Sequence, residues 1–335
     1  MHHLSRRQLV HSVGVAGLAL LAGCGRWPWQ AQERDRVYRM GYLRPIPLDA
    51  APHLLEAFRH GLREHGYVEG SNLIIEYRSS DGNSERLPDL AAELVSLQVD
   101  VIVAAANPAI QAAKNATSTI PIVMAPSGDP VGAGLVASLS RPGGNITGVS
   151  LLTVQLSAKR LELLKEILPG LSRVAYLSDP RNPSTALDLR EMHVAAQTLG
   201  LTLQSLEVSS PADLEPVFET AKRESVEAVI VPAGPFFLTH AARTVALAAE
   251  YRLPATYGNR ELVDIGGLLT YSPSNPSLQR RSAYFVDRIL KGTKPADLPV
   301  EQPTEFELVI NLKTAQALGL TIPQHVLLQA TEVIQ

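Results

Sequence analysis

The sequence of 335 residues contains a single cysteine, Cys24, and this scarcity limits what the protein can be. One thiol cannot form an intramolecular disulfide, so the stability of the folded chain has to come from its hydrophobic core. A catalytic cysteine needs a histidine partner and an electropositive setting, whereas Cys24 lies where a leader peptide ends.

Basic surfaces, long apolar runs and aromatic residues are also scarce. Without Arg6 and Arg7 of the leader, 28 basic residues remain against 33 acidic ones, a net charge of −5. The sequence has no lysine-rich run and no pattern of arginines among aromatics, which argues against nucleic acid as a partner. After the first 22 residues no apolar segment approaches the length of a membrane span.

Enzyme motifs are missing as well. The sequence has no GxSxG elbow and no HExxH, and RPGGN at residues 141–145 lacks the spacing of a nucleotide-binding loop. The histidines beyond the leader are scattered along the chain: His53, His60, His65, His193, His240 and His325. The sequence therefore predicts no catalytic residue, no metal site and no cofactor.

The N-terminus has the layout of a secretory signal. Arg6 and Arg7 precede an apolar segment at residues 10–22, which is too short to remain as a transmembrane helix. Residues 21–24 read Leu-Ala-Gly-Cys and resemble a bacterial lipobox, in which the cysteine sulfur is acylated and becomes the new N-terminus.

Cys24 is therefore predicted to be a lipid anchor that holds an exported domain on the periplasmic side of the cell envelope. Residues 1–23 are predicted to be the signal peptide and residues 24–36 a tether. The alternative is a disposable signal with an incidental cysteine. Ser5-Arg6-Arg7 also resembles a twin-arginine signal, which leaves two export routes open.

From residue 37 onward, short apolar runs rich in β-branched residues alternate twice with helical periodicity. Near-continuous apolar runs such as residues 99–106 are typical of strands buried on both faces of a parallel sheet. Such alternation implies right-handed βαβ units, so the predicted fold class is α/β with two doubly wound, Rossmann-like lobes. The expected strands lie at residues 39–43, 73–77, 99–106, 120–125, 148–150, 173–177, 202–208, 226–231, 254–257 and 268–271.

Four joints between strands and helices pair a good N-cap residue with proline. In open parallel sheets such joints lie at the carboxyl ends of strands, where ligands bind and helix N-termini offer free N–H groups. The four are Asn107-Pro108, Asp129-Pro130, Asn182-Pro183 and Ser210-Pro211.

Two segments carry a family resemblance. NPAIQAAKNATSTIPIVMAPSGDPVGAGLVASLSRPGGNITGVS (residues 107–150) and FELVINLKTAQALGLTIP (residues 306–323) resemble substrate-binding proteins of ABC transporters, of the tryptophan/tyrosine-binding lipoprotein type. The resemblance implies a type I periplasmic-binding-protein architecture with a three-strand hinge. Lobe 1 would comprise residues 37–152 and about 278–300, and lobe 2 residues 153–277 and about 301–335.

The resemblance also implies a function. The protein would bind a small solute, such as an amino acid, close about hinges near residues 151–155 and 292–297, and act as a monomer with a membrane permease. Where relatives often carry Gly-Thr this chain has Ala106-Asn107, so the aromatic specificity of the family stays open. The alternatives are a sensory lipoprotein not coupled to transport, or an exported enzyme that uses the same cleft.

Eight residues are predicted to bind the solute, each with a structural alternative. Asp129 would pair with an ammonium group or only cap a helix, and Phe236 and Tyr257 would sandwich an apolar side chain or only pack in the core. Arg44 would bind a carboxylate or lie solvated on the surface. The remaining residues would bind polar groups of the solute or form local turns: Asn107, Ser127, Asp179 and Asn182.

Overall fold

The computed structural model describes residues 36–335, without the side chains of residues 153–155. The chain divides into residues 1–37 and a compact unit, Tyr38–Gln335. The predicted signal peptide and Cys24 lie outside the described residues.

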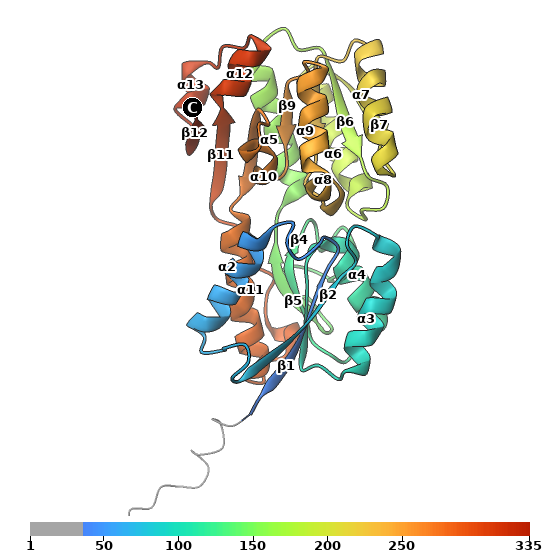
Figure 1. Cartoon of the computed structure of the whole chain (residues 1–335), viewed down its shortest axis with the longest axis vertical. Helices are drawn as coiled ribbons and strands as arrows, with labels where there is room; N and C mark the ends of the chain where they lie inside the picture. Colours follow the sequence, from blue (N-terminus) through green and yellow to red (C-terminus); the bar gives the residue numbers. More distant parts are fainter. Residues whose placement is uncertain (1–35) are drawn as a thin grey trace, which may run out of the picture. The chain divides into compact units, whose positions relative to one another are not determined.

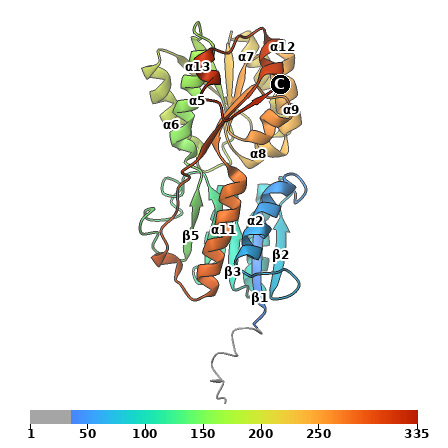
Figure 2. The same ribbon diagram turned by 90° about the vertical axis from the view of Figure 1, so that its left-hand side faces the viewer.

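The first half of this unit is built on a parallel sheet of five strands in the order β2-β1-β3-β4-β5 (Figure 1). Helices cover both of its faces, and Figure 2 shows α2 and α11 side by side on one of them. The elements are β1 (Tyr38–Arg44), α2 (Pro52–Glu64), β2 (Leu73–Ser79), η2 (Ser84–Arg86), α3 (Leu87–Ser96), β3 (Val101–Ala104), α4 (Ala106–Ala116), β4 (Ile122–Ser127), β5 (Ile146–Ser150), α11 (Asn275–Leu290) and η4 (Pro295–Asp297).

The second half is built on seven strands in the order β12-β11-β10-β9-β8-β6-β7, with β10 and β11 antiparallel. Its strands are β6 (Arg173–Ser178), β7 (Thr202–Glu207), β8 (Ala228–Val231), β9 (Ala255–Tyr257), β10 (Leu269–Pro273), β11 (Phe306–Asn311) and β12 (Glu332–Ile334).

Helices flank this second sheet on both faces, as the two core clusters beside it show. They are α5 (Thr153–Ile167), α6 (Thr185–Thr198), η3 (Pro211–Asp213), α7 (Leu214–Arg223), α8 (Pro235–Thr239), α9 (Ala241–Glu250), α10 (Arg260–Asp264), α12 (Leu312–Leu318) and α13 (Gln324–Leu327).

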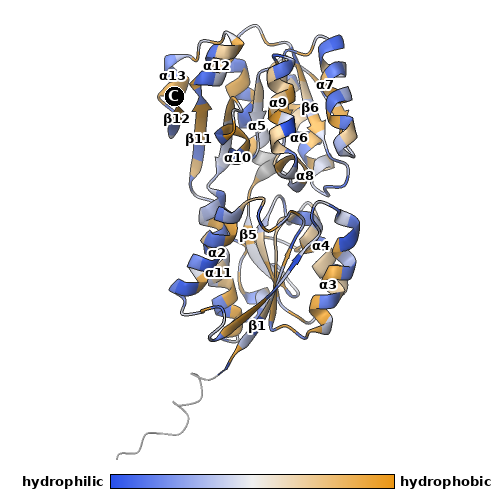
Figure 3. Ribbon diagram, in the orientation of Figure 1, coloured by the Kyte–Doolittle hydropathy of each residue, from blue (hydrophilic) through white to orange (hydrophobic). Residues whose placement is uncertain are grey.

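The apolar pattern of the sequence explains the layers. All four residues of β3 and all four of β8 are buried, as expected for central parallel strands covered on both faces. Hydrophobic colour lies on strands such as β1, whereas the helix α2 shows a hydrophilic face (Figure 3). In α7 the residues at i, i+3, i+4 and i+7 are the buried ones: Leu214, Val217, Phe218 and Ala221.

The predicted fold class is therefore confirmed, with differences in detail. The C-terminal strands β11 and β12 were not among the expected ones. No helix begins at Pro130, where the described chain forms turns. Of the four expected caps only Ser210 occupies an N-cap position, in a capping box at η3.

The chain passes between the two sheets at three places in the described part: after β5, after β10 and before β11. The first of these adjoins the expected hinge at residues 151–155. The segment expected as the second hinge, residues 292–297, lies instead within the first half, where Thr147 Oγ1 donates to the carbonyl of Leu298 (2.7 Å). The crossing comes later, between the bridge of Glu301 to Val149 and the start of β11 at Phe306.

Candidate functional site

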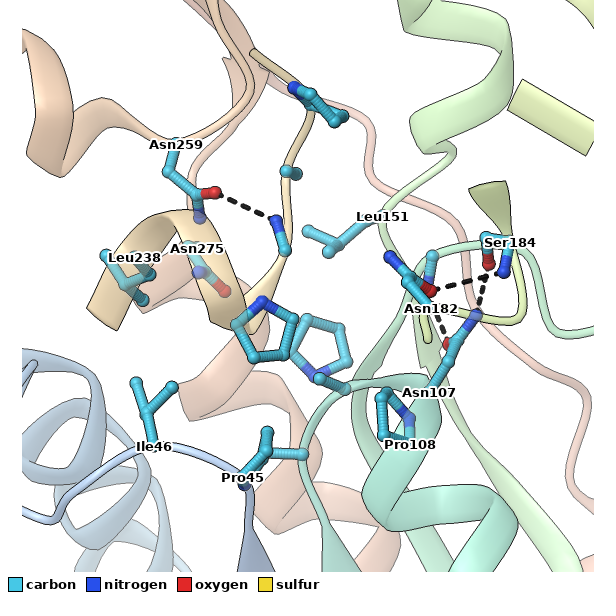
Figure 4. Close-up of a pocket in the computed structure, with 18 of the residues that line it drawn as sticks. Pro45, Ile46, Asn107, Pro108, Leu151, Asn182, Ser184, Leu238, Asn259 and Asn275 are labelled. Carbon is cyan, nitrogen blue, oxygen red and sulfur yellow. Dashed lines mark hydrogen bonds between the residues drawn. The ribbon is translucent and has the colours of Figure 1, made fainter. Parts of the chain in front are cut away.

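A pocket with a cavity volume of about 100 Å³ lies between the two sheets, at the carboxyl ends of their strands (Figure 4). Its walls are the loops after β1, β3 and β4 of the first sheet and after β6, β8 and β9 of the second. Strand ends of this kind are where ligands bind in open α/β sheets. The N-termini of α4, α6 and α11 also reach the pocket, and the positive end of a helix dipole favours an anionic group there.

Arg44, at the end of β1, supplies the positive charge of the pocket. Its side chain is buried, and its Nη1 has no hydrogen-bond partner among the described residues. Burial lowers the pKa of the Arg44 guanidinium, and Tyr42 and Asp49 act in the opposite direction. A buried N–H without an acceptor is costly, so this arrangement favours an acceptor supplied by a bound molecule.

Asp188, in the first turn of α6, supplies the negative charge. Its Oδ2 accepts a hydrogen bond from the hydroxyl of Tyr176 (2.6 Å), and its Oδ1 accepts one from Ser157 Oγ. Burial raises the pKa of Asp188, while these two hydrogen bonds and the charge of Arg160 lower it. A carboxylate has about four acceptor positions, so Asp188 retains room for a further donor.

Arg44 and Asp188 are the two charged side chains among the described residues that line this pocket. One belongs to the first sheet and the other to a helix beside the second. A molecule that carries both an anionic and a cationic group can therefore be held from both sides.

Asn107 joins the two halves across the pocket. Its Nδ2 donates to Ser184 Oγ at the start of α6. Its Oδ1 accepts from Ser127 Oγ (2.7 Å) and from the backbone N–H of Gly128 (3.0 Å), which fixes the amide on the first sheet (Figure 4 shows Asn107 and Ser184 facing each other).

The residue before Asn107 is strained. Ala106 has φ 66°, in the left-handed region that glycine occupies without a steric cost. Strain of this kind persists where the surrounding structure holds it, as at a binding site.

The rest of the wall is mostly apolar, with a few amides. Asn275 Oδ1 is buried and has no hydrogen-bond partner among the described residues, whereas Gln279 Nε2 donates to the carbonyl of Ala125 (3.0 Å). Apolar side chains make up most of the remaining surface: Pro45, Ile46, Leu54, Pro108, Leu151, Pro235 and Leu238.

A second polar contact between the halves lies near the pocket. His53 Nε2 of α2 is 3.1 Å from Glu261 Oε1 of α10. The hydrogen bond with Glu261 raises the pKa of His53 above its ordinary value of 6.5. Asp264 acts in the same direction, and burial and Arg44 oppose it.

The structure brings together some of the residues predicted from the sequence. Arg44, Asn107 and Asn182 line the pocket, and Ser127 lies buried directly behind Asn107. Asn182 is not a helix cap, since Ser184 occupies that position of α6, but its Oδ1 accepts from the N–H of Ser184 (3.2 Å).

The other predicted residues lie elsewhere. Asp129 forms a turn with the N–H of Gly132 (2.9 Å) and caps no helix. Asp179 and Phe236 border a small cavity of about 20 Å³ that adjoins the pocket at Pro108, Asn182 and Pro235, and both contact Arg181 there. Tyr257 is buried in the core of the second half, the structural alternative given for it.

Several residues that line the pocket do not follow a strand, so the search of strand ends in the sequence did not find them. Asp188 and Gln279 lie inside helices, and Tyr176 lies within β6. Asn275 begins the long helix α11. The Ser-Asn-Pro sequence around it is a strand–helix joint of the same type as the four named from the sequence.

Two sheets joined by three crossings, with a pocket between their strand ends, define a binding protein with the type I periplasmic-binding-protein fold. Residues 42–334 match the model of a family described as ABC transporter substrate binding protein, and the chain belongs to this family. Proteins of this family work outside the cytoplasm. Within residues 36–335 no helix is long and apolar enough to cross a membrane.

Individual relatives support the assignment. The chain is 24% identical over 315 residues to a tyrosine-binding protein of Clostridioides difficile, covering 92% of this chain and 90% of the relative. It is 29% identical to an ABC domain from Streptococcus pneumoniae solved in complex with L-Trp, with TM-score 0.84 over 89% of this chain and 100% of the other. A conserved domain protein from Vibrio cholerae is 28% identical with TM-score 0.85, over the same shares of the two chains.

Proposed function

We propose that this protein is the extracytoplasmic receptor of an ABC importer and that it binds a free α-amino acid between its two halves. One observation carries the proposal: the pocket has one buried cation, Arg44, and one buried anion, Asp188, on opposite sides. An amino acid is a zwitterion and offers a partner to each of them.

The residues on each wall of the pocket indicate which group of the solute binds there. The carboxylate accepts hydrogen bonds from Arg44 Nη1 and lies near the positive end of α4. The ammonium group donates to Asp188 and to Asn275 Oδ1. The apolar wall, including Leu151 and Leu238, surrounds the side chain.

The size of the pocket narrows the choice of solute. A water-sized group needs about 10–15 Å³ of such space, so the cavity holds roughly seven to ten non-hydrogen atoms. That suits an amino acid with an aliphatic side chain. The tyrosine and tryptophan named for the relatives are larger, and in this chain they would extend into an adjoining cavity.

Closure of the two halves couples binding to transport. The solute contacts both halves only when they are shut, so its binding free energy shifts the population toward the closed form. A monomeric receptor anchored through Cys24 presents that closed form to a membrane permease. The contact between Asn107 and Ser184 is one that opening would break.

The function is tested by a thermal-shift screen against the common amino acids, short peptides and sugars. A ligand at 100 times its Kd stabilises the folded protein by about 2.7 kcal/mol, which raises the melting temperature measurably. We expect α-amino acids to raise it and sugars to leave it unchanged. A response to sugars alone, or chemical turnover of a bound compound, would refute the proposal.

The contact between His53 and Glu261 predicts a pH dependence of solute binding. The pKa of His53 is raised in the closed form, so the ion pair contributes fully below about pH 6.5 and is lost as pH rises through the raised value. The pair is half-exposed, and such pairs contribute about 0.2–1 kcal/mol. We expect solute affinity to fall up to about fivefold between pH 6 and pH 8.5.

Calorimetry at several pH values checks this prediction. His53→Gln is expected to flatten the profile. His60→Gln is the matched control, because His60 lies on the same helix but pairs with Glu64 in the same half. An unchanged profile in His53→Gln would show that this contact does not stabilise the closed form.

A further inference from the structure

A second cavity, of about 260 Å³, adjoins the pocket. The two share part of their walls: Leu151, Ala233, Asn259 and Asn275 line both. The second cavity is more than twice as large as the first and extends toward α5 and α10. A solute bound in the first pocket can therefore reach into the second past Asn275.

Arg160 of α5 is the most deeply buried charged side chain that lines this second cavity. It is 1% exposed, and its Nε donates to the carbonyl of Tyr271 (2.9 Å). Its Nη2 is buried without a hydrogen-bond partner among the described residues. Five N–H donors of a guanidinium normally find acceptors when they are buried, so the free Nη2 indicates an acceptor from a bound molecule.

The other cations of the second cavity already have carboxylate partners. His53 is bonded to Glu261 (3.1 Å). Arg260 pairs with Asp264 (3.4 Å), with Glu307 (3.3 Å) and with Glu332 outside the cavity.

Arg160, in contrast, has no carboxylate of the described residues within 4.0 Å. Asp188 acts on it at longer range, but the two oxygens of Asp188 accept from Ser157 and Tyr176. Arg160 is thus the cation of this cavity that has no direct ion pair among the described residues.

We propose that the second cavity is a subsite for a distal carboxylate of the solute, held by Arg160. The proposal rests on the proposed function, since the amino-acid head group occupies the first pocket. It names the substrate class more closely: an α-amino acid that carries a second acidic group beyond an apolar spacer. A carboxylate matches the planar guanidinium and gives a charge-assisted hydrogen bond that water screens little at this depth.

The test compares pairs of probes that differ only in the distal group. Calorimetry would measure L-2-aminopimelate against L-2-aminoheptanoate, and L-2-aminoadipate against L-norleucine, with the full mature chain. We expect the acidic member of at least one pair to bind about tenfold or more tightly, as a hydrogen bond between charged groups predicts. The ratio of the affinity of the acidic probe to that of its neutral partner should fall to about one or below in Arg160→Met and stay above one in Arg160→Lys.

Ser274→Asp provides a second variant that leaves Arg160 in place. Ser274 lines the second cavity and is the N-cap of α11, a position that aspartate also suits. Its added negative charge should lower the ratio even if Arg160→Met proves unable to fold. A ratio of one or less in the wild type, or an unchanged ratio in the variants, would overturn the subsite.

The outcome also separates the subsite from the proposed function. If neutral amino acids bind but no acidic preference appears, the subsite is wrong and the proposed function stands. If pimelate binds in an Arg160-dependent way while no α-amino acid binds, the proposed function is wrong and the subsite stands. No binding by any probe would overturn both.

Discussion

Replacing Arg44 by methionine is expected to weaken amino-acid binding about 100-fold or more. Arg44 supplies the positive charge of the pocket and has a buried Nη1 without a partner. A hydrogen bond to a charged group contributes about 1.5–3 kcal/mol, and a guanidinium can offer two of them to one carboxylate. Since 1.4 kcal/mol is a tenfold change in Kd, the loss of about 3 kcal/mol gives the expected factor.

Calorimetry on purified protein measures this effect, with the decarboxylated amine of the same solute as a second ligand. The amine should bind the wild type at least as weakly as the amino acid binds Arg44→Met, because decarboxylation removes the contact with Arg44 together with the attraction of the α4 N-terminus. Arg86→Met is the matched control, since Arg86 lies in the same half but is exposed and pairs with Asp81. A loss of less than about fivefold in Arg44→Met would rule out Arg44 as the carboxylate partner.

Replacing Cys24 by serine is expected to move the protein from the membrane fraction to the soluble fraction. The resemblance of residues 21–24 to a lipobox is the basis of this prediction, because serine lacks the sulfur that would be acylated. Each buried methylene contributes about 0.8 kcal/mol, and two or more chains are needed for stable anchoring. Without any acyl chain, almost all of the protein is therefore expected in the soluble fraction.

Fractionation of bacterial cells, combined with labelling by a fatty-acid analogue, measures the effect. Gly25→Ala is the matched control, because it changes the next residue and keeps the thiol. Retention of Cys24→Ser in the membrane fraction would mean that the segment before residue 36 binds membranes by another route, or that the signal is never removed.

The fold was predictable because its determinants are periodic in the sequence. Buried parallel strands such as β3 and β8 read as unbroken apolar runs, and α7 has its apolar residues at helical spacing. β11 was missed as a strand although its sequence is apolar, because it follows a long helix and pairs antiparallel with β10. Such a long-range pairing leaves no local signal.

The site was predictable only where strand ends define it. Arg44 is the last residue of β1 and Asn107 lies three residues after β3, so the rule that ligands bind at the carboxyl ends of strands finds them. Asp188 lies one turn inside α6 and reaches the pocket through helix packing that the sequence does not reveal. Tyr257 also ends a strand, but its side chain points into the core. Successive side chains of a strand point to opposite faces of the sheet, so a shift of one residue determines which of them is buried.

Asp129 shows why a local motif alone is insufficient. Aspartate before proline is a good start for a helix, yet Gly132 and Gly134 follow at once, and Gly134 adopts φ 66°. The segment therefore folds into turns instead of a helix. The carboxylate bonds the N–H of Gly132 and lies outside the residues that line the pocket.

The most direct test of the account is a crystal structure of the protein with the amino acid that raises its melting temperature most. The account predicts the carboxylate within hydrogen-bond distance of Arg44 Nη1 and the ammonium group beside Asp188, with the two halves closed around both. A solute bound outside this pocket, or bound in it without contact to Arg44, would contradict the account.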